Sequence, residues 1–344
     1  MKKICAVTSI IAIATVVLFA TSYPVYSKEK VIRLRYSNFH PPVHAIGKLS
    51  EEWCREVEKR TNGRVKIQYY PGSTLTPPMQ TYDSVAKGIA DIGESLVAYA
   101  PGRLPLSEVL MLPLGYANGY QATKLANEFF KKFRPKEFDD VKMMFMHGGD
   151  HTRICTTKPT TSIKSIKGLR LITNSQAAKI VSAVGGAPVT IPVTESYDSL
   201  QRGMCDGFFM MLESLKGFKL CEVTKYCLDN PAVSYNAAIF IVMNKNKWNL
   251  ISQKDREIIE KINEEWIEKQ GKLWNRVIKE SIEYAKQHGV KFVNVSQQEI
   301  EETSAAMKPV INDYISAMKA KGLPGKEAVD FCLDYLKKHP ESGE

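Results

Sequence analysis

The sequence predicts an α/β protein of two similar lobes that one long helix connects. Three observations support this fold class. Strand-like and helix-like patterns alternate along the chain, a ten-residue segment occurs twice, and one helical pattern runs without interruption from Ser252 to His288. With 344 residues, 44% of them hydrophobic and 24% charged, the chain is long enough for two lobes that each bury a core.

The alternation is clearest in the N-terminal third of the chain. Apolar residues recur at every second position in strands and at every third or fourth position in helices. Strand, helix, strand, helix and strand are expected in turn over residues 31–36, 46–61, 65–69, 79–87 and 89–93. This order is typical of a largely parallel sheet covered by helices, and such sheets bind ligands beyond the carboxyl ends of their strands.

The repeated segment covers residues 82–91 and 197–206, which are identical at five of ten positions. Each copy has the pattern of a helix end, a glycine cap at Gly88 or Gly203, and the start of a strand. The two copies therefore predict equivalent corners in two similar lobes.

The long helical pattern begins at Ser252, a preferred N-cap residue, and ends at Gly289. At 1.5 Å per residue such a helix is roughly 55 Å long, which exceeds the diameter of one lobe. We expect lobe I to comprise residues 28–151 with 237–276 and lobe II to comprise 152–236 with 277–344. The chain would then cross between lobes near His151, near Tyr235 and in the middle of the helix.

The first residues have the pattern of a signal peptide, with two lysines before an apolar run over residues 4–20. We expect cleavage after residue 27 and a soluble periplasmic chain. The net charge of +10 falls to +8 without this segment, which holds two lysines and no acids. Because the excess basic residues are scattered, nucleic acid is excluded as an expected partner.

Six cysteines remain after residue 27, at positions 54, 155, 205, 221, 227 and 332. Export permits disulfides, but the pairing stays open, and buried free thiols are the alternative. None of the common nucleophile, metalloprotease or nucleotide-binding motifs occurs in the sequence. We therefore expect a protein that is not an enzyme, with no cofactor and no metal site.

Polar and aromatic residues directly after predicted strands are the candidate ligand contacts. For the phenylalanines the alternative is core packing, and for the glutamates it is a surface position or a helix N-terminus. The candidates are Asn38, Phe39, His40, Glu94, Ser95, Phe208, Phe209 and Glu213.

Several segments resemble the solute-binding subunit of tripartite ATP-independent periplasmic (TRAP) transporters, of the dicarboxylate-binding, DctP-like type. The segments are residues 90–93, 166–172, 184–192, 197 and 206–207. The resemblance implies a two-lobed periplasmic binding protein fold with a long lobe-spanning helix. It also implies closure on a small ligand without chemistry, and delivery of that ligand to TRAP membrane permease subunits in secondary transport. We expect a monomer.

The chain departs from this resemblance where the family has an arginine that clamps the ligand carboxylate. Ile172 occupies that position, with Asn174 nearby, while Arg170 lies two residues earlier on the same strand face. Arg153 matches a second family arginine, so we expect it to be the main cation available to an acid.

Three further positions complete the expected site. Val193 and Met210, both apolar, match pocket-side positions of the family, and Tyr235 lies at an expected crossing. An organic acid is the favoured solute. A neutral, aromatic or amine solute, or an ATP-driven transporter as partner, is the alternative, and an exported enzyme is less favoured.

Overall fold

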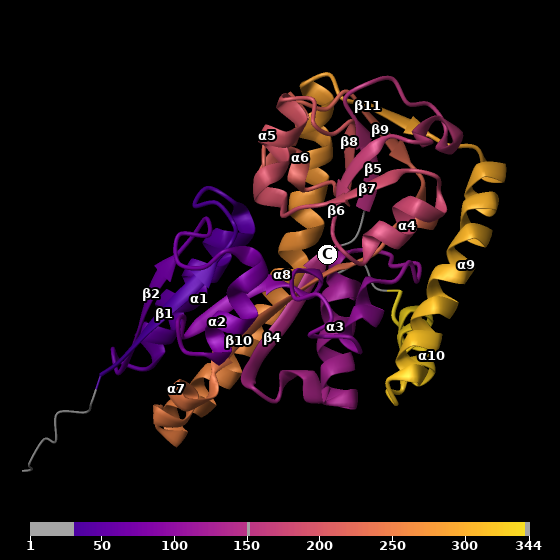
Figure 1. Cartoon of the computed structure of the whole chain (residues 1–344). Coiled ribbons are helices and arrows are strands. Elements are labelled where there is room, and N and C mark those ends of the chain that lie inside the picture. Colours follow the sequence, from indigo (N-terminus) through magenta and orange to yellow (C-terminus); the bar gives the residue numbers. More distant parts are fainter. Residues whose placement is uncertain (1–30, 150–151, 341–344) are drawn as a thin grey trace, which may run out of the picture. The chain divides into compact units, whose positions relative to one another are not determined.

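Two β-sheets organise the protein (Figure 1). The computed structural model describes residues 31–149 and 152–340, so the predicted signal peptide lies outside the described residues. Within these two ranges, none of the helices combines the length and the apolar character needed to cross a membrane.

The first sheet has five strands in the order β2-β1-β3-β10-β4. β1 pairs in parallel with β2 and β3, whereas β10 is antiparallel to both β3 and β4. β10 therefore enters this sheet from a distant part of the sequence. The strands are β1 (Ile32–Asn38), β2 (Val65–Tyr70), β3 (Ile92–Leu96), β4 (Val141–Gly149) and β10 (Ala237–Asn244).

The helices around the first sheet begin and end as their local sequences indicate. The side chain of His44 caps α1 by accepting from the backbone N–H of Ile46, and the chain leaves the helix through Asn62 and Gly63, both at positive φ. The helices and turns are α1 (Ala45–Arg60), η1 (Pro78–Gln80), α2 (Thr81–Ala86), η2 (Val97–Tyr99), η3 (Ser107–Met111), α3 (Gly119–Phe133), η4 (Lys136–Phe138) and α7 (Lys245–Leu250).

The second sheet has six strands in the order β11-β9-β5-β8-β6-β7. Its strands are β5 (Thr152–Thr156), β6 (Arg170–Thr173), β7 (Ala187–Thr190), β8 (Gly207–Met211), β9 (Tyr226–Asp229) and β11 (Lys291–Asn294). Its short helices and turns are η5 (Ile163–Ile166), α4 (Ala177–Ala183), η6 (Val193–Glu195), α5 (Ser196–Gln201), α6 (Ser214–Gly217), η7 (Leu220–Glu222) and η8 (Pro231–Val233).

One disulfide cross-links two strands of the second sheet. Cys155 on β5 and Cys227 on β9 are directly opposite each other in an antiparallel pair and are bonded. The remaining cysteines among the described residues, at positions 54, 205, 221 and 332, are buried and free. Both alternatives left open by the sequence therefore occur in one chain.

The repeated segments form equivalent corners with the same hydrogen bonds. In the first sheet, Asp91 accepts from the backbone and the side chain of Arg35, whose guanidinium also donates to the carbonyl of Gly88. In the second sheet, Asp206 accepts from Arg170 in the same way, and Arg170 donates to the carbonyl of Gly203. The repeat thus encodes a helix-to-strand corner that an arginine of the neighbouring strand closes.

The long helix α8 (Gln253–Gln287) confirms the predicted lobe-spanning helix. It packs on α1, α3 and β4 beside the first sheet and on α6 beside the second, as Figure 1 shows. The chain ends in α9 (Gln297–Ala320), which packs on α4, and α10 (Gly325–Lys338), which packs on α3. The exact lobe boundaries stay a prediction.

Two expectations about strand ends were wrong. β3 begins at Ile92 and extends to Leu96, so Glu94 and Ser95 lie inside the strand rather than after it. Phe208 and Phe209 likewise lie inside β8 and are fully buried. The turn that follows Gly88 or Gly203 contains more residues than the sequence pattern indicated. Each strand therefore begins and ends later in the sequence than expected.

Candidate functional site

A pocket lies between the two sheets. Its walls come from the carboxyl ends of β3, β6 and β8, from segments that follow β1, β3, β6, β7 and β8, and from β10. The lining residues are Phe39, His40, Leu96, Tyr99, Thr173, Asn174, Ile191, Val193, Met210, Met211, Glu213, Ser214, Phe218, Tyr235, Ala237 and Ile239. Most of them are apolar or aromatic, which is typical of a small-molecule site with a few polar anchors.

The charge of the lining is unusual for a site that binds acids. None of the described residues that line the pocket is a lysine or an arginine, and Glu213 is the acidic residue among them. No cluster of three possible metal ligands occurs among the described residues. The apolar and aromatic side chains of the lining favour contact with an organic molecule.

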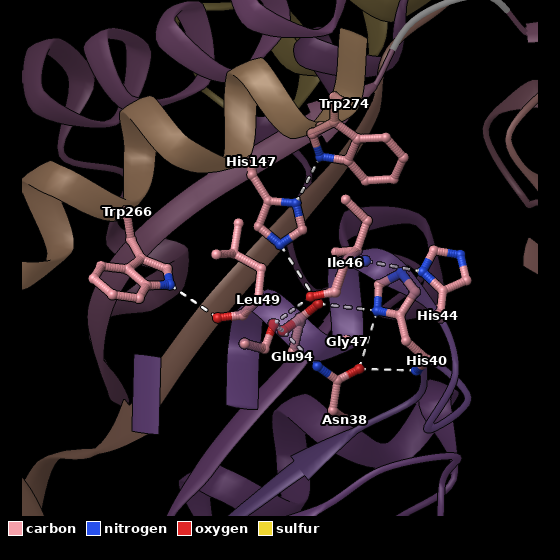
Figure 2. Close-up of polar contacts among 12 residues, drawn as sticks. Asn38, His40, His44, Ile46, Gly47, Leu49, Glu94, His147, Trp266 and Trp274 are labelled. Atoms are coloured by element: carbon pink, nitrogen blue, oxygen red, sulfur yellow. Dashed lines mark hydrogen bonds and ion pairs between the residues drawn. The ribbon is translucent and has the colours of Figure 1, made fainter. Parts of the chain in front are cut away.

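Behind the pocket, the carboxylate of Glu94 is the centre of a buried hydrogen-bond network (Figure 2). Its Oε2 accepts from the Tyr36 hydroxyl at 2.6 Å, from Asn38 Nδ2 at 2.7 Å and from the Ser50 hydroxyl at 2.8 Å. Its Oε1 lies 3.1 Å from His40 Nδ1 and 3.5 Å from His147 Nε2. Burial alone would raise the pKa of this carboxyl, but the donors from His147 and His40 outweigh burial and hold the pKa well below its usual range.

This network fixes which nitrogen of His40 carries the proton. Asn38 Oδ1 accepts from the backbone N–H of His40 at 2.8 Å and from its Nδ1 at 3.0 Å. An amide oxygen only accepts, so Nδ1 is protonated and Nε2 keeps its lone pair in the neutral ring. Burial, with the neighbouring His44 as the second cause, lowers the pKa of His40 to about 4. His40 is therefore neutral at pH 7.

A hydrogen bond joins the two sides of the pocket at His44 and Glu213. His44 Nδ1 accepts from the backbone N–H of Ile46 at 3.2 Å, so its Nε2–H donates to Glu213 Oε2, at 2.8 Å. A Cβ at Gly217 would collide with His44 Nε2, so the glycine allows this approach. The N-terminus of α1 is thereby tied to the segment after β8.

Two more hydrogen bonds join segments of the two sheets. The backbone N–H of Val193 donates to the Tyr99 hydroxyl at 2.8 Å, and the Ser175 hydroxyl donates to the carbonyl of Ala98 at 2.9 Å. Both connect η2, beside the first sheet, to segments of the second sheet. Together with the bond between His44 and Glu213, they hold the two walls closed around the pocket.

Seven of the predicted site residues line the pocket, and eight do not. Asn38 and Glu94 lie behind His40, whereas Ser95, Phe208, Phe209 and Ile172 are buried in the sheets. The residues in the lining are Phe39, His40, Asn174, Val193, Met210, Glu213 and Tyr235. The remaining two predictions are the arginines.

Both arginines lie outside the described lining and are held by acids of the protein. Arg153 Nε donates to Asp229 at 2.5 Å, and its Nη1 donates to the carbonyl of Thr152 at 3.0 Å. Arg170 lies at the exposed start of β6, where it closes the corner at Asp206. The geometry of the described residues therefore does not support Arg153 as the main cation for an acid ligand.

Tyr99, His44 and Phe218 are site residues that the sequence did not single out. The sequence repeat contained a signal for Tyr99. With the repeat spacing of 115 residues, Tyr99 is the position equivalent to Ser214 in the other lobe. Both post-strand turns line the pocket. His44 and Phe218 carry no comparable signal, since their partners come from the other sheet.

The chain is similar to a known family over most of its length. The family model DctP, described as bacterial extracellular solute-binding protein, family 7, matches residues 36–317. The outer membrane transporter protein TsaT of Comamonas testosteroni is 24% identical over 81% of this chain and 84% of its own. A solute-binding protein of Chromohalobacter salexigens is 23% identical over 81% and 83%.

Solved structures agree with the two-lobed fold. A TRAP periplasmic solute-binding protein from Desulfovibrio salexigens, in an open complex, is 30% identical with a TM-score of 0.78 over 91% of this chain and 98% of that chain. A TRAP protein from Bordetella bronchiseptica with bound mandelate is 26% identical, with a TM-score of 0.81 over 89% and 99%. A marine metagenome TRAP protein specific for aromatic acids shares the fold at 24% identity, with a TM-score of 0.85 over 90% and 100%. The predicted fold class is confirmed.

Proposed function

Because the chain belongs to the bacterial extracellular solute-binding proteins of family 7, we propose that it captures a small organic solute in the pocket between its sheets and delivers it to TRAP permease subunits in the membrane. The observation that carries this proposal is the pocket itself. Both sheets contribute to its walls, and three hydrogen bonds join segments of the two sheets, including the one between His44 and Glu213.

The solute has a compact, largely apolar body. Ile191, Met210 and Met211 form apolar walls on one side, and Phe39 and Leu96 lie on the other. The Bordetella relative binds mandelate, which has one phenyl ring, and this supports a body of about that size. The relative does not define the polar end of the solute, because Ile172 stands where the resemblance places a clamping arginine.

The processing and architecture of the receptor follow from the same proposal. Residues 1–27 are removed on export, and the mature protein acts as a periplasmic monomer. Lobe I comprises 28–151 with 237–276, lobe II comprises 152–236 with 277–344, and the three crossings form the hinge. N-terminal sequencing and light scattering of the exported protein test these statements, and an uncut leader or a stable dimer would contradict them.

Mass spectrometry of the solute that co-purifies with the protein tests the function. A ligand that binds only the folded state stabilises it by roughly 3 to 4 kcal/mol at 100 to 1,000 times Kd, so the compound should raise the melting midpoint and should be recovered unchanged. Ile191→Trp fills the pocket and should abolish the shift. Ile89→Trp, at an exposed position outside the lining, should not. Conversion of the compound to a product would contradict the proposal.

A further inference from the structure

Two hydrogen-bond acceptors lie unpaired at one end of the pocket. His40 and Glu213 are 1% and 5% exposed, and both line the pocket. Among the described residues, Nε2 of His40 and Oε1 of Glu213 have no hydrogen-bond partner, whereas His40 Nδ1 and Glu213 Oε2 are both engaged. These two atoms are therefore free to accept a hydrogen bond from a ligand.

The two acceptors belong to side chains that both neighbour His44. The rings of His40 and His44 lie 4.5 Å apart between centroids, and His44 Nε2 is 2.8 Å from Glu213. Aromatic rings flank the same end of the pocket. Phe39 stacks on His40 at 4.1 Å, and Phe218 lies 5.3 Å from the ring of His44.

Some donors of the lining are committed to the protein itself, whereas the hydroxyls of Tyr99 and Tyr235 accept in their hydrogen bonds and keep an O–H to donate. Asn174 Nδ2 donates to the hydroxyl of Tyr235, and the hydroxyls of Thr173 and Ser214 donate to backbone carbonyls. With no lysine or arginine among the described lining residues, a carboxylate placed at this end would face the carboxylate of Glu213 and a lone pair of His40. Such a contact is repulsive and leaves charges unpaired.

Building on the receptor function proposed above, we propose that this end of the pocket recognises an amino group and that the solute is a small organic amine. An ammonium group has three N–H donors, enough for Oε1 of Glu213 and Nε2 of His40 together. The aromatic rings of Phe39 and Phe218 add a favourable cation–π environment. The apolar body of the amine lies against the methionines on the opposite side.

Matched compounds that share one ring and differ only in the polar group test this directly. Benzylamine, benzyl alcohol and benzoate form the first set, and further sets vary the ring substituents. Calorimetric titration should rank amine above alcohol and alcohol above carboxylate in each set that binds. A carboxylate or an alcohol that binds as tightly as its amine would overturn the proposal.

Two acid-to-amide variants sharpen the test. Glu213→Gln keeps an oxygen that can accept from His44 but removes the charge, so it should weaken amine binding roughly 10- to 100-fold and change alcohol binding little. Glu283→Gln, at an exposed position on α8 that pairs with Lys286, is the control and should leave both affinities unchanged. Equal losses for amine and alcohol in Glu213→Gln would contradict an ammonium partner.

If none of the synthetic compounds binds, the chemical identity of the co-purified solute tests the proposal. A solute with an amino group supports the proposal, and a solute without one overturns it while leaving the receptor function intact. If no small molecule co-purifies and none shifts the melting midpoint, the receptor function itself is contradicted.

Discussion

Two buried glutamates, one beside each sheet, have opposite roles. Glu94 on β3 is fully buried, and one of its carboxylate oxygens accepts from three side chains of the protein. Glu213, after β8, is also buried but gives only one oxygen to the protein, through His44. Both glutamates are therefore buried, and they differ in the number of hydrogen-bond donors that contact each carboxylate.

The difference shows how the protein divides structure from binding. A carboxylate that accepts several hydrogen bonds from its own chain and lies behind the pocket acts as a buried support. Glu94 accepts a hydrogen bond from Asn38, and Asn38 accepts one from His40. This network therefore fixes the orientation and the tautomer of a histidine that lines the pocket. Glu213 keeps one oxygen open and can respond to a solute. Substitutions at each site can test this division.

Glu94→Gln should produce the largest effect. The amide removes the charge and places N–H groups against the donors of Tyr36, Asn38 and Ser50, which leaves buried groups unpaired. We expect a loss of about 3 to 5 kcal/mol in the free energy of unfolding, measured by urea denaturation. Glu213→Gln is the matched variant and should cost less than about 1 kcal/mol. Equal losses would contradict the division of roles.

The stability of the protein should fall as the pH falls from 6.5 to 4. The pKa of His40 is lowered to about 4 in the fold, so the unfolded chain binds a proton that the native protein does not. Stability contributed by neutral His40 is thus present above pH 6.5 and decreases by at most about 3 kcal/mol toward pH 4. The lowered pKa of Glu94 extends the loss to lower pH.

Urea titrations at several pH values measure this slope. His40→Gln removes the titrating group and should flatten the pH dependence between 6.5 and 4. His288→Gln, at the exposed end of α8, should keep the wild-type dependence. An unchanged slope in His40→Gln would show that other groups control the acid sensitivity.

His44→Phe should have a smaller effect, on closure rather than on folding. Phenylalanine keeps a ring against Phe218 but loses the hydrogen bond to Glu213. We expect the open form to gain about 1 to 2 kcal/mol relative to the closed form. Small-angle scattering of the solute-free protein should then report a larger radius of gyration than for the wild type, and an unchanged radius would mean that this bond does not hold the lobes together.

The two corner arginines should show the smallest effects. Arg35→Ala and Arg170→Ala each remove the bond of a half-exposed guanidinium, so Arg170→Ala should change the unfolding free energy little, and Arg35→Ala should cost slightly more because its partner Asp91 is buried. Neither should change solute affinity. A clear loss of solute affinity in Arg170→Ala would show that this arginine contacts the solute and that the two corners are not equivalent.

The sequence predicted the fold better than the site because the fold depends on local patterns. The caps of α8, its apolar stripe and the repeated glycine corner are all visible within short stretches of sequence. The partners of the arginines are not, because Asp229 and Asp206 reach Arg153 and Arg170 only through strand pairing. Without these partners, both arginines look available to a ligand.

The same limit explains the histidines. No sequence pattern linked His40 or His44 to an acid. Their partners, Glu94 on β3 and Glu213 after β8, belong to different sheets and are far away in sequence. Only tertiary contacts show which acid accepts from several side chains and which accepts from one.

A crystal structure of the protein with its co-purified solute would show which chemical group binds at Glu213 and His40. We expect a small molecule between the sheets, with its amino nitrogen at hydrogen-bond distance, roughly 3 Å, from both Oε1 of Glu213 and Nε2 of His40. A solute whose carboxylate contacts Arg153, with Asp229 displaced, would contradict this expectation.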